Sequence, residues 1–169
     1  MGNAQFTKDL PLWAGLTAAL PMVILQSNET STTGDAETID VTGSSITIPQ
    51  GFFAPGTTFR YTLYGSRTGT AGAATILVDI AGTTVATIAI PTDTAVDWKA
   101  VIEIAAHTDF AHQNVSETVF TSATVLTAYD TATGTVNVAG DVTMKAQMTL
   151  ASASDSVTCS HVRLECWKL

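Results

Sequence analysis

The residues of this sequence whose types are best suited to chemistry gather between positions 103 and 112. Glu103, His107, Asp109 and His112 offer two imidazoles and two carboxylates, which are groups that bind Zn²⁺. His107 and Asp109 would share one face of a strand, but His112 is an odd number of positions from both and would point the other way. No second pair of ligands stands nearby. We therefore predict a loop with solvent-facing polar side chains and no metal, with His107, Asp109 and His112 as the candidates that a metal analysis would test.

Motifs of known catalytic and cofactor sites are missing from the sequence. It contains no glycine-rich phosphate loop of the required spacing, no Cys-x-x-Cys, no Gly-x-Ser-x-Gly and no His-Glu-x-x-His. Acid–base catalysis needs paired carboxylates or a histidine held by a carboxylate, and the acids here mostly stand in turn-like contexts, such as Asp35, Asp93 and Asp155. We predict a protein that is not an enzyme and that has no cofactor.

The net charge and the composition argue against one class of partner, nucleic acid, and indicate the kind of surface that the protein has. Seven Lys and Arg against fifteen Asp and Glu give a net charge of −8, so binding of nucleic acid is disfavoured. Only 13% of residues are charged, which leaves Thr, Ser, Asn, Gln and Gly to cover the surface. This composition is typical of extracellular and particle-borne β proteins.

The elements that must position any site are strands. The 169 residues correspond to about one domain, rich in the β-branched Val, Ile and Thr that favour pleated sheets. Turn signals such as Gly43-Ser44, Pro55-Gly56 and Arg67-Thr68-Gly69 recur at intervals of about ten residues. The expected strands are 38–42, 45–48, 57–64, 73–80, 84–90, 96–106, 117–128, 136–138, 141–151 and 156–167. Their number and spacing predict an all-β sandwich or barrel.

Apolar and polar residues alternate along several of these strands, which assigns one face of each strand to the core and the other to solvent. The apolar and polar sets are Phe59, Tyr61 and Leu63 against Arg60, Thr62 and Tyr64; Trp98, Ala100, Ile102 and Ile104 against Lys99, Val101 and Glu103; and Val162, Leu164 and Cys166 against His161, Arg163 and Glu165. Trp98 is predicted to be a core anchor. Cys159 and Cys166 are an odd number of positions apart, so on one continuous strand they would face opposite ways, and we predict two buried thiols.

The N-terminal residues form an apolar segment without a place in this pattern. We predict an N-terminal arm and linker over residues 1–37, followed by the sandwich domain over 38–169. A secretory signal is disfavoured by Asp9, by prolines at both ends of the apolar stretch and by the lack of an Ala-x-Ala site. The stretch is also too short to span a membrane. The side chains expected to dock on a partner are Phe6, Leu10, Leu12, Trp13, Leu16, Leu20, Val23, Ile24 and Leu25.

The order of strands and turn residues along the chain resembles that of a known group of virus proteins. The run from Ser45 to Gly65 reads as strand, Pro, small loop, Phe, Gly-Thr, strand, Gly, and the strands 73–80 and 98–104 continue it. A late strand begins at Asp141, and the closing strand is entered through residues 154–159. This order resembles the jelly-roll virion proteins of tailed bacteriophages, which include trimeric head decoration or cement proteins and the heads of tail fibres.

The resemblance implies an antiparallel jelly-roll β-sandwich with an extended apolar N-terminal arm, assembled as a homotrimer on the capsid surface of a virion. The implied partner is the major capsid protein. A trimer with three arms would bind the shell more firmly than a single arm would. One alternative is a tail-fibre or receptor-binding head that contacts host polysaccharide. Another is a secreted carbohydrate-binding β-sandwich, which would require removal of the first 25 residues.

Overall fold

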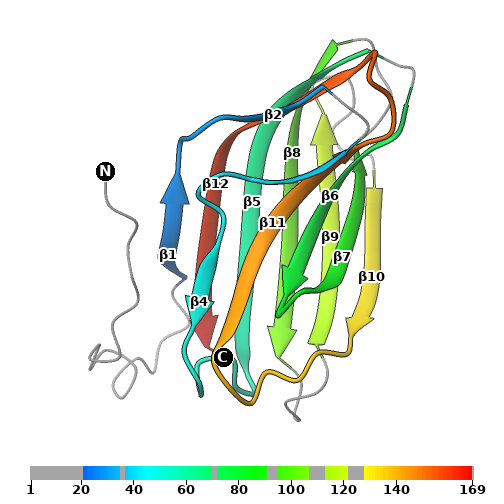
Figure 1. Ribbon diagram of the computed structural model, residues 1–169. Coiled ribbons are helices and arrows are strands. Elements are labelled where there is room, and N and C mark those ends of the chain that lie inside the picture. The colour runs from blue at the N-terminus through cyan, green and yellow to red at the C-terminus, as the bar shows by residue number, and fades with distance from the viewer. Residues whose placement is uncertain are drawn as a thin grey trace.

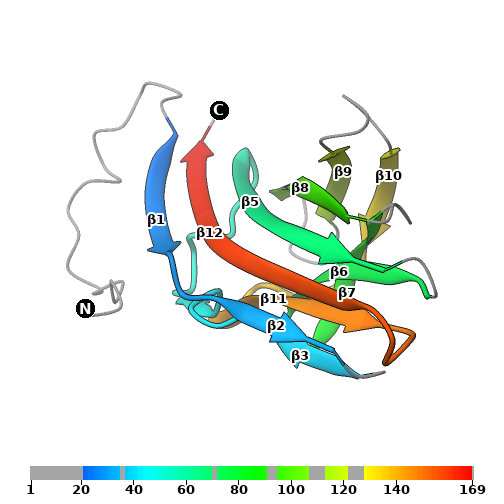
Figure 2. The same cartoon turned by 90° about the horizontal axis from the view of Figure 1, so that it is seen from above.

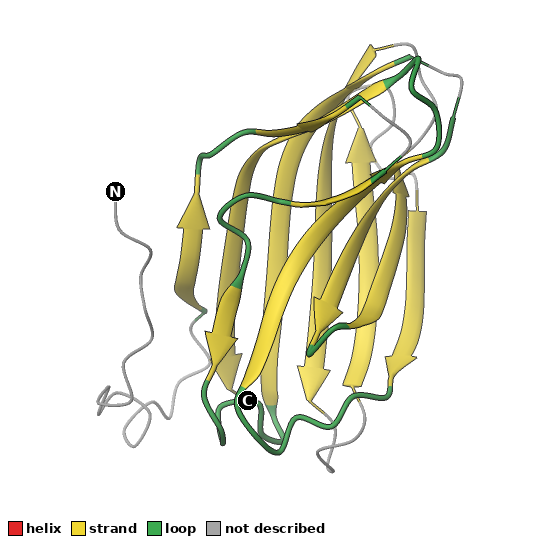
Figure 3. Ribbon diagram, viewed as in Figure 1, coloured by secondary structure: helices red, strands yellow, loops and turns green. Residues whose placement is uncertain are grey.

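The protein is described here by a computed structural model, which places residues 21–34, 37–69, 72–90, 95–106, 113–121 and 128–168. Within these ranges the chain forms strands joined by loops and turns, and no helix (Figure 3). None of the described residues therefore belongs to a helix of the length and hydropathy that crossing a membrane requires. The all-β prediction is confirmed.

The strands form two antiparallel sheets, which Figures 1 and 2 show packed face to face. The larger sheet has the order β1 (Met22–Ser27), β12 (Ser156–Lys168), β5 (Thr57–Thr68), β8 (Ala95–Ala106), β9 (Gln113–Thr121) and β10 (Ala128–Gly134), with β2 (Ser31–Thr33) also on β12. The smaller sheet has the order β3 (Thr38–Asp40), β11 (Val142–Leu150), β6 (Ala74–Ile80) and β7 (Thr83–Ile90), with β4 (Ile46–Ile48) also on β11.

The strand pairing is that of a jelly roll. The first strands β1 and β2 pair with the last strand β12, and β3 and β4 pair with β11. Inside this frame β5 pairs with β8, and β6 pairs with β7. Such nested pairing is what a long hairpin gives when it rolls up into two sheets. The β9–β10 hairpin extends the larger sheet beyond β8. The jelly-roll prediction is confirmed.

The core lies between the two sheets and uses the apolar faces that alternation predicted. Phe59, Tyr61 and Leu63 point inward from β5, and Met144 and its alternate neighbours point inward from β11. Each large apolar side chain buried in this way contributes about 1.5–3 kcal/mol relative to an exposed one. Tyr61 is fully buried, and its hydroxyl donates a 2.9 Å hydrogen bond to the carbonyl of Ser44.

The end of the predicted arm belongs to the sandwich, contrary to the predicted boundary at residue 37. β1 pairs with β12 from Met22 to Ser27, and β2 adds to the same strand. Ile24 is only 4% exposed within the core, and Leu25 packs against that core. The prediction that Ile24 docks on a partner is therefore wrong, because its side chain already fills the space between the sheets. Val23 alternates with Ile24 and is 41% exposed.

Several further strand boundaries differ from the prediction, and β9 and β10 take the place of the single strand expected at 117–128. Residues 136–138 were expected to be a strand, but they link β10 to β11, with Val136 and Val138 buried. The expected turn at 67–69 begins too early, because β5 continues to Thr68. In the predicted strand 117–128, residues 122–127 lie outside the described residues.

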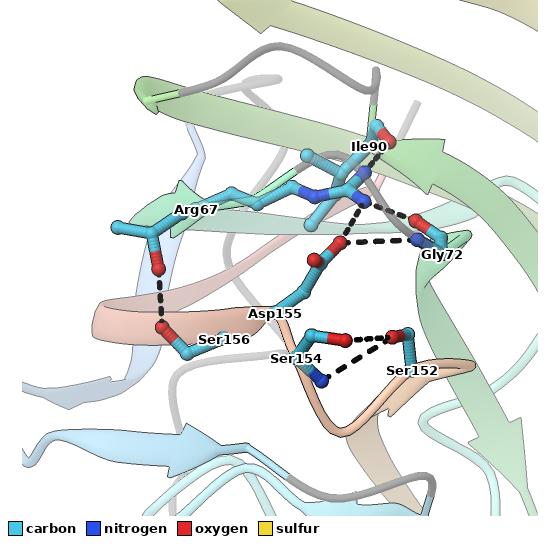
Figure 4. A network of polar contacts seen from close by, with 8 residues as sticks. Arg67, Gly72, Ile90, Ser152, Ser154, Asp155 and Ser156 are labelled. Atoms are coloured by element: carbon cyan, nitrogen blue, oxygen red, sulfur yellow. Dashed lines mark hydrogen bonds and ion pairs between the residues drawn. The ribbon is translucent and has the colours of Figure 1, made fainter.

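Arg67 does not mark a turn but closes one end of the core (Figure 4). Its side chain is 1% exposed and its guanidinium pairs with Asp155 at 2.9 Å, which joins β5 to the loop before β12. The same guanidinium donates to the carbonyls of Ile90, at 3.0 Å, and Gly72. Asp155 in turn accepts the backbone N–H of Gly72 at 3.1 Å. One ion pair therefore ties together three loop regions at this end of the sandwich.

Candidate functional site

Many of the residues predicted to form a site lie outside the described residues. These are the metal candidates His107, Asp109 and His112, and the arm residues Phe6, Leu10, Leu12, Trp13, Leu16 and Leu20. Glu103 is described, and it lies on β8 with its carboxylate 2.5 Å from the guanidinium of Arg60. Among the residues that the structure places, no group of three or more His, Cys, Asp or Glu side chains could hold a metal ion.

The candidate site that the structure reveals lies on the outer face of the larger sheet. The registers of β12, β5, β8 and β9 align the outward side chains in three rows that run across the strands. The first row is His161, Tyr64, Lys99 and Phe120; the second is Arg163, Thr62, Val101 and Thr118; the third is Glu165, Arg60, Glu103 and Ser116. Directly opposite side chains on neighbouring strands are close enough to interact.

The first row combines aromatic rings with cations. The Lys99 ammonium lies 5.4 Å from the ring centre of Tyr64 and 5.8 Å from that of Phe120. Tyr64 also contacts the imidazole of His161, with ring centres 5.6 Å apart. The Nδ1 of His161 lies 2.6 Å from Oδ1 of Asn28, and since that oxygen only accepts, Nδ1 carries the proton. These contacts hold a row of amphipathic side chains upright on the sheet.

The third row is an ion-pair network. Arg60 pairs with Glu103 through Nη2 and Nε, at 2.5 and 2.7 Å, and its Nη1 is 3.9 Å from Glu165. Glu165 also pairs with Arg163 at 2.7 Å, while the Arg60 guanidinium lies 4.7 Å from the ring centre of Trp167. Arg60 lies between the two carboxylates, so they form a network rather than a pair of free carboxyl groups flanking a reacting bond.

A groove separates these two rows because short side chains occupy most of the row between them, with Arg163 at one end. Thr62, Val101 and Thr118 form its floor, and the hollow above them has a volume of about 380 Å³. It extends across four strands, or roughly 14 Å at the usual strand spacing. Three of the seven Lys and Arg side chains of the protein line it, with two glutamates, so its local net charge is +1 in a chain of net charge −8.

The chemistry available in this groove is that of binding. It offers aromatic faces, hydroxyl groups, cations and paired carboxylates, which is the set of groups that a polar ligand site uses. The two cysteines lie elsewhere, in the core, as free and buried thiols, as predicted. Burial raises the pKa of Cys159 to about 11 and that of Cys166 to about 12, so neither thiol is a nucleophile near neutral pH.

Both cysteines face the core although their spacing predicted opposite faces. A β-bulge between Cys159 and His161 inserts one extra residue into β12 and shifts the alternation by one position. The same bulge turns His161 outward beside Tyr64. The bulge therefore positions His161 at one end of the first row that lines the groove.

Sequence comparison identifies no relative, since no known protein family and no curated protein matches this chain. Several solved structures are similar in shape, and three of them are described here. Peanut lectin with a nine-residue peptide is 7% identical with a TM-score of 0.47, covering 89% of this chain and 99% of the lectin. The CBM36-1 domain of a multidomain xylanase from the hindgut metagenome of Trinervitermes trinervoides is 12% identical with a TM-score of 0.36, covering 86% and 96%. Infectious bursal disease virus, Gx strain, is 10% identical with a TM-score of 0.28, covering 89% and 38%. At TM-scores below 0.5, these similarities carry no ligand or partner over to this chain.

Proposed function

We propose that this protein is a structural virion protein, which binds the outside of a bacteriophage head as a homotrimer and stabilises the shell by binding rather than by catalysis. One observation carries the proposal. The described strands, from Met22 in β1 to Lys168 in β12, supply two sheets with jelly-roll pairing, and the sequence of residues 1–20 before them is rich in large apolar residues. Those residues include Phe6, Leu10, Leu12, Trp13 and Leu16, whose apolar side chains are suited to a partner such as the major capsid protein.

The position of β1 supports this role for the preceding residues. Among the described strands β1 lies at the edge of the larger sheet, so the described part of the chain begins at the rim of the sandwich, and a sheet edge is a place where another chain can pair. Each apolar side chain buried on a partner contributes about 1.5–3 kcal/mol before the cost of ordering the segment. Three linked copies would raise the apparent affinity well above that of one copy.

The test is a head-binding assay on the full chain. The variant combines Leu12→Ser, Trp13→Ser and Leu16→Ser, and the matched control is Ala89→Ser, which changes an exposed residue of β7 outside the N-terminal segment. Sedimentation with empty heads of the phage that encodes the protein measures binding, and analytical ultracentrifugation measures the oligomeric state. We expect the triple variant to remain a folded trimer and to lose at least tenfold in affinity, with the control unchanged.

Two results would overturn the proposal. Unchanged binding by the triple variant would show that the N-terminal residues do not bind the head. A wild-type protein that is monomeric at the concentrations of the assay removes the trimer.

A second candidate function is contact with host polysaccharide by a tail-fibre head. The groove on the outer face favours it, because an aromatic ring that is 40% exposed at Tyr64 lies there beside hydroxyl and charged groups. Copy number in purified virions separates the two functions: a decoration protein is present at close to lattice number, and a fibre head in only a few copies.

A further inference from the structure

We infer that the groove on the outer face of the larger sheet binds an acidic oligosaccharide, a sugar chain that carries carboxylate groups. This inference rests on the second candidate function and specifies its ligand. It is independent of head binding, because no residue of the groove belongs to the N-terminal segment 1–20.

The charge of the groove selects an anion. Within the described part of the chain, Lys99 has no carboxylate partner, and its ammonium contacts only the rings of Tyr64 and Phe120. Lys99 therefore has no paired negative charge among the described residues, although the protein as a whole is strongly acidic. A bound carboxylate would supply that charge in a site that is partly shielded from water, where ion pairs are stronger.

Arg163 provides a second cation on the same part of the floor. It lies directly opposite Thr62 across the β12–β5 pair, and Lys99 is diagonal to Thr62 across the β5–β8 pair. Diagonal neighbours are about 7–8 Å apart, within reach of long side chains. One guanidinium nitrogen of Arg163 pairs with Glu165, while its Nε is buried with no hydrogen-bond partner. The geometry therefore offers two cations around one threonine hydroxyl.

The aromatic rings favour a sugar over other anions. Tyr64 and Phe120 stand on either side of Lys99, and both line the groove with aromatic surface. The C–H face of a sugar ring packs on such a surface, while its hydroxyl groups reach Thr62, Thr118 and Glu103. A nucleic acid is disfavoured because Glu103 and Glu165 would face its phosphates. A neutral sugar would leave the charge of Lys99 uncompensated.

The experiment measures binding of defined tetrasaccharides to the full chain by isothermal titration calorimetry and NMR titration. The probes are tetramers of galacturonate, of mannuronate, and of alternating glucuronate and N-acetylglucosamine. Each is paired with its methyl ester, which keeps the ring and removes the charge. We expect at least one acid to bind, its ester to bind at least tenfold more weakly, and its affinity to fall as salt is raised.

The variants are Lys99→Met, which keeps the length of the side chain, and Tyr64→Ser. The matched control is Lys145→Met, which removes a lysine that lies outside the groove and pairs with Asp40. We expect each groove variant to lose at least tenfold in affinity and the control to lose nothing. Failure of all three acids to bind, equal binding of acid and ester, or an unchanged Lys99→Met affinity would each overturn the inference. Head binding by the same wild-type preparation is measured separately, so the two proposals fail independently.

Discussion

The indole of Trp98 packs directly over Gly65 on the neighbouring strand. The two residues are register partners in the β5–β8 pair, and Trp98 is 2% exposed, which confirms it as a core anchor. A Cβ atom on Gly65 would lie 2.5 Å from Cζ2 of Trp98 and would overlap the carbonyl oxygen of Thr158. Glycine is therefore required at this position for space, because any side chain would push the indole and β12 apart.

Substitution Gly65→Ala should destabilise the protein strongly. Overpacking of a core costs about 1–3 kcal/mol, and the contact with a backbone atom places this case at about 3 kcal/mol. Gly140→Ala is the matched control, since nothing lies within 4 Å of a Cβ at that position. The free energy of unfolding from urea titration measures both. A loss below 1 kcal/mol for Gly65→Ala would contradict the close packing of Trp98.

Substitution Asp155→Asn should be among the most damaging single changes to the surface loops. It leaves the buried guanidinium of Arg67 without its counter-charge, and breaking a buried ion pair from one side costs about 3–5 kcal/mol. Asp40→Asn is the comparison, because Asp40 pairs with Lys145 while its own side chain is 59% exposed. Exposed pairs contribute about 0–1 kcal/mol. Equal losses for the two variants would show that the Arg67 pair is not buried in solution.

The two thiols should make stability depend on pH in the alkaline range. Burial raises the pKa of Cys159 and Cys166 above the ordinary value of 9.0, so above pH 9 the unfolded chain releases protons that the folded chain keeps. Stability is then complete below pH 9 and falls as pH rises toward 11, by at most about 1.4 kcal/mol per pH unit for each thiol.

Urea titrations between pH 8 and pH 10.5 measure this slope. The double variant Cys159→Ala/Cys166→Ala should show a shallower one. At pH 8 a thiol reagent should modify the wild type only after denaturant unfolds it. Rapid modification of the folded protein would be incompatible with two core thiols.

Substitutions at two adjacent residues of β1 should differ greatly in their effect on stability. Ile24→Ala should cost about 2–5 kcal/mol because it opens a cavity between the sheets. Val23→Ala changes an exposed side chain and should stay within about 0.5 kcal/mol. Thermal unfolding of both variants is the measurement. If the two lose the same stability, β1 is not part of the cooperative unit.

The alternation of apolar and polar residues predicted which face of each long strand is buried. It did not predict which strands lie beside each other. The alternation in the runs that became β5, β8 and β12 correctly separated Tyr64, Lys99 and His161 from the core, because one-sided burial imposes a period of two. That these three side chains stand in one row depends on strand order and register, which arise from pairings between distant segments. The groove was therefore invisible in the sequence, although its polar side chains on β5, β8 and β12 were assigned to a solvent face.

The missed features have local physical causes. Arg67 is followed by Thr and Gly, which resembles a turn, and only its distant partner Asp155 makes burial of the charge possible. The bulge before His161 has no signature in the sequence, and it reversed the predicted facing of one cysteine relative to the other. Residues 22–25 are apolar like the segment before them, so the point where the sheet begins could not be distinguished.

The pairing of β1 with β12 also sets the order of events during synthesis. β12 lies between β1 and β5, so the larger sheet remains open along its middle until the last segment of the chain has been translated. Contacts between such distant segments form slowly, and an incomplete product exposes sheet edges that promote aggregation. A stop codon just before Ser156 would remove the strand that joins β1 to β5 and would thus be as harmful as an early one.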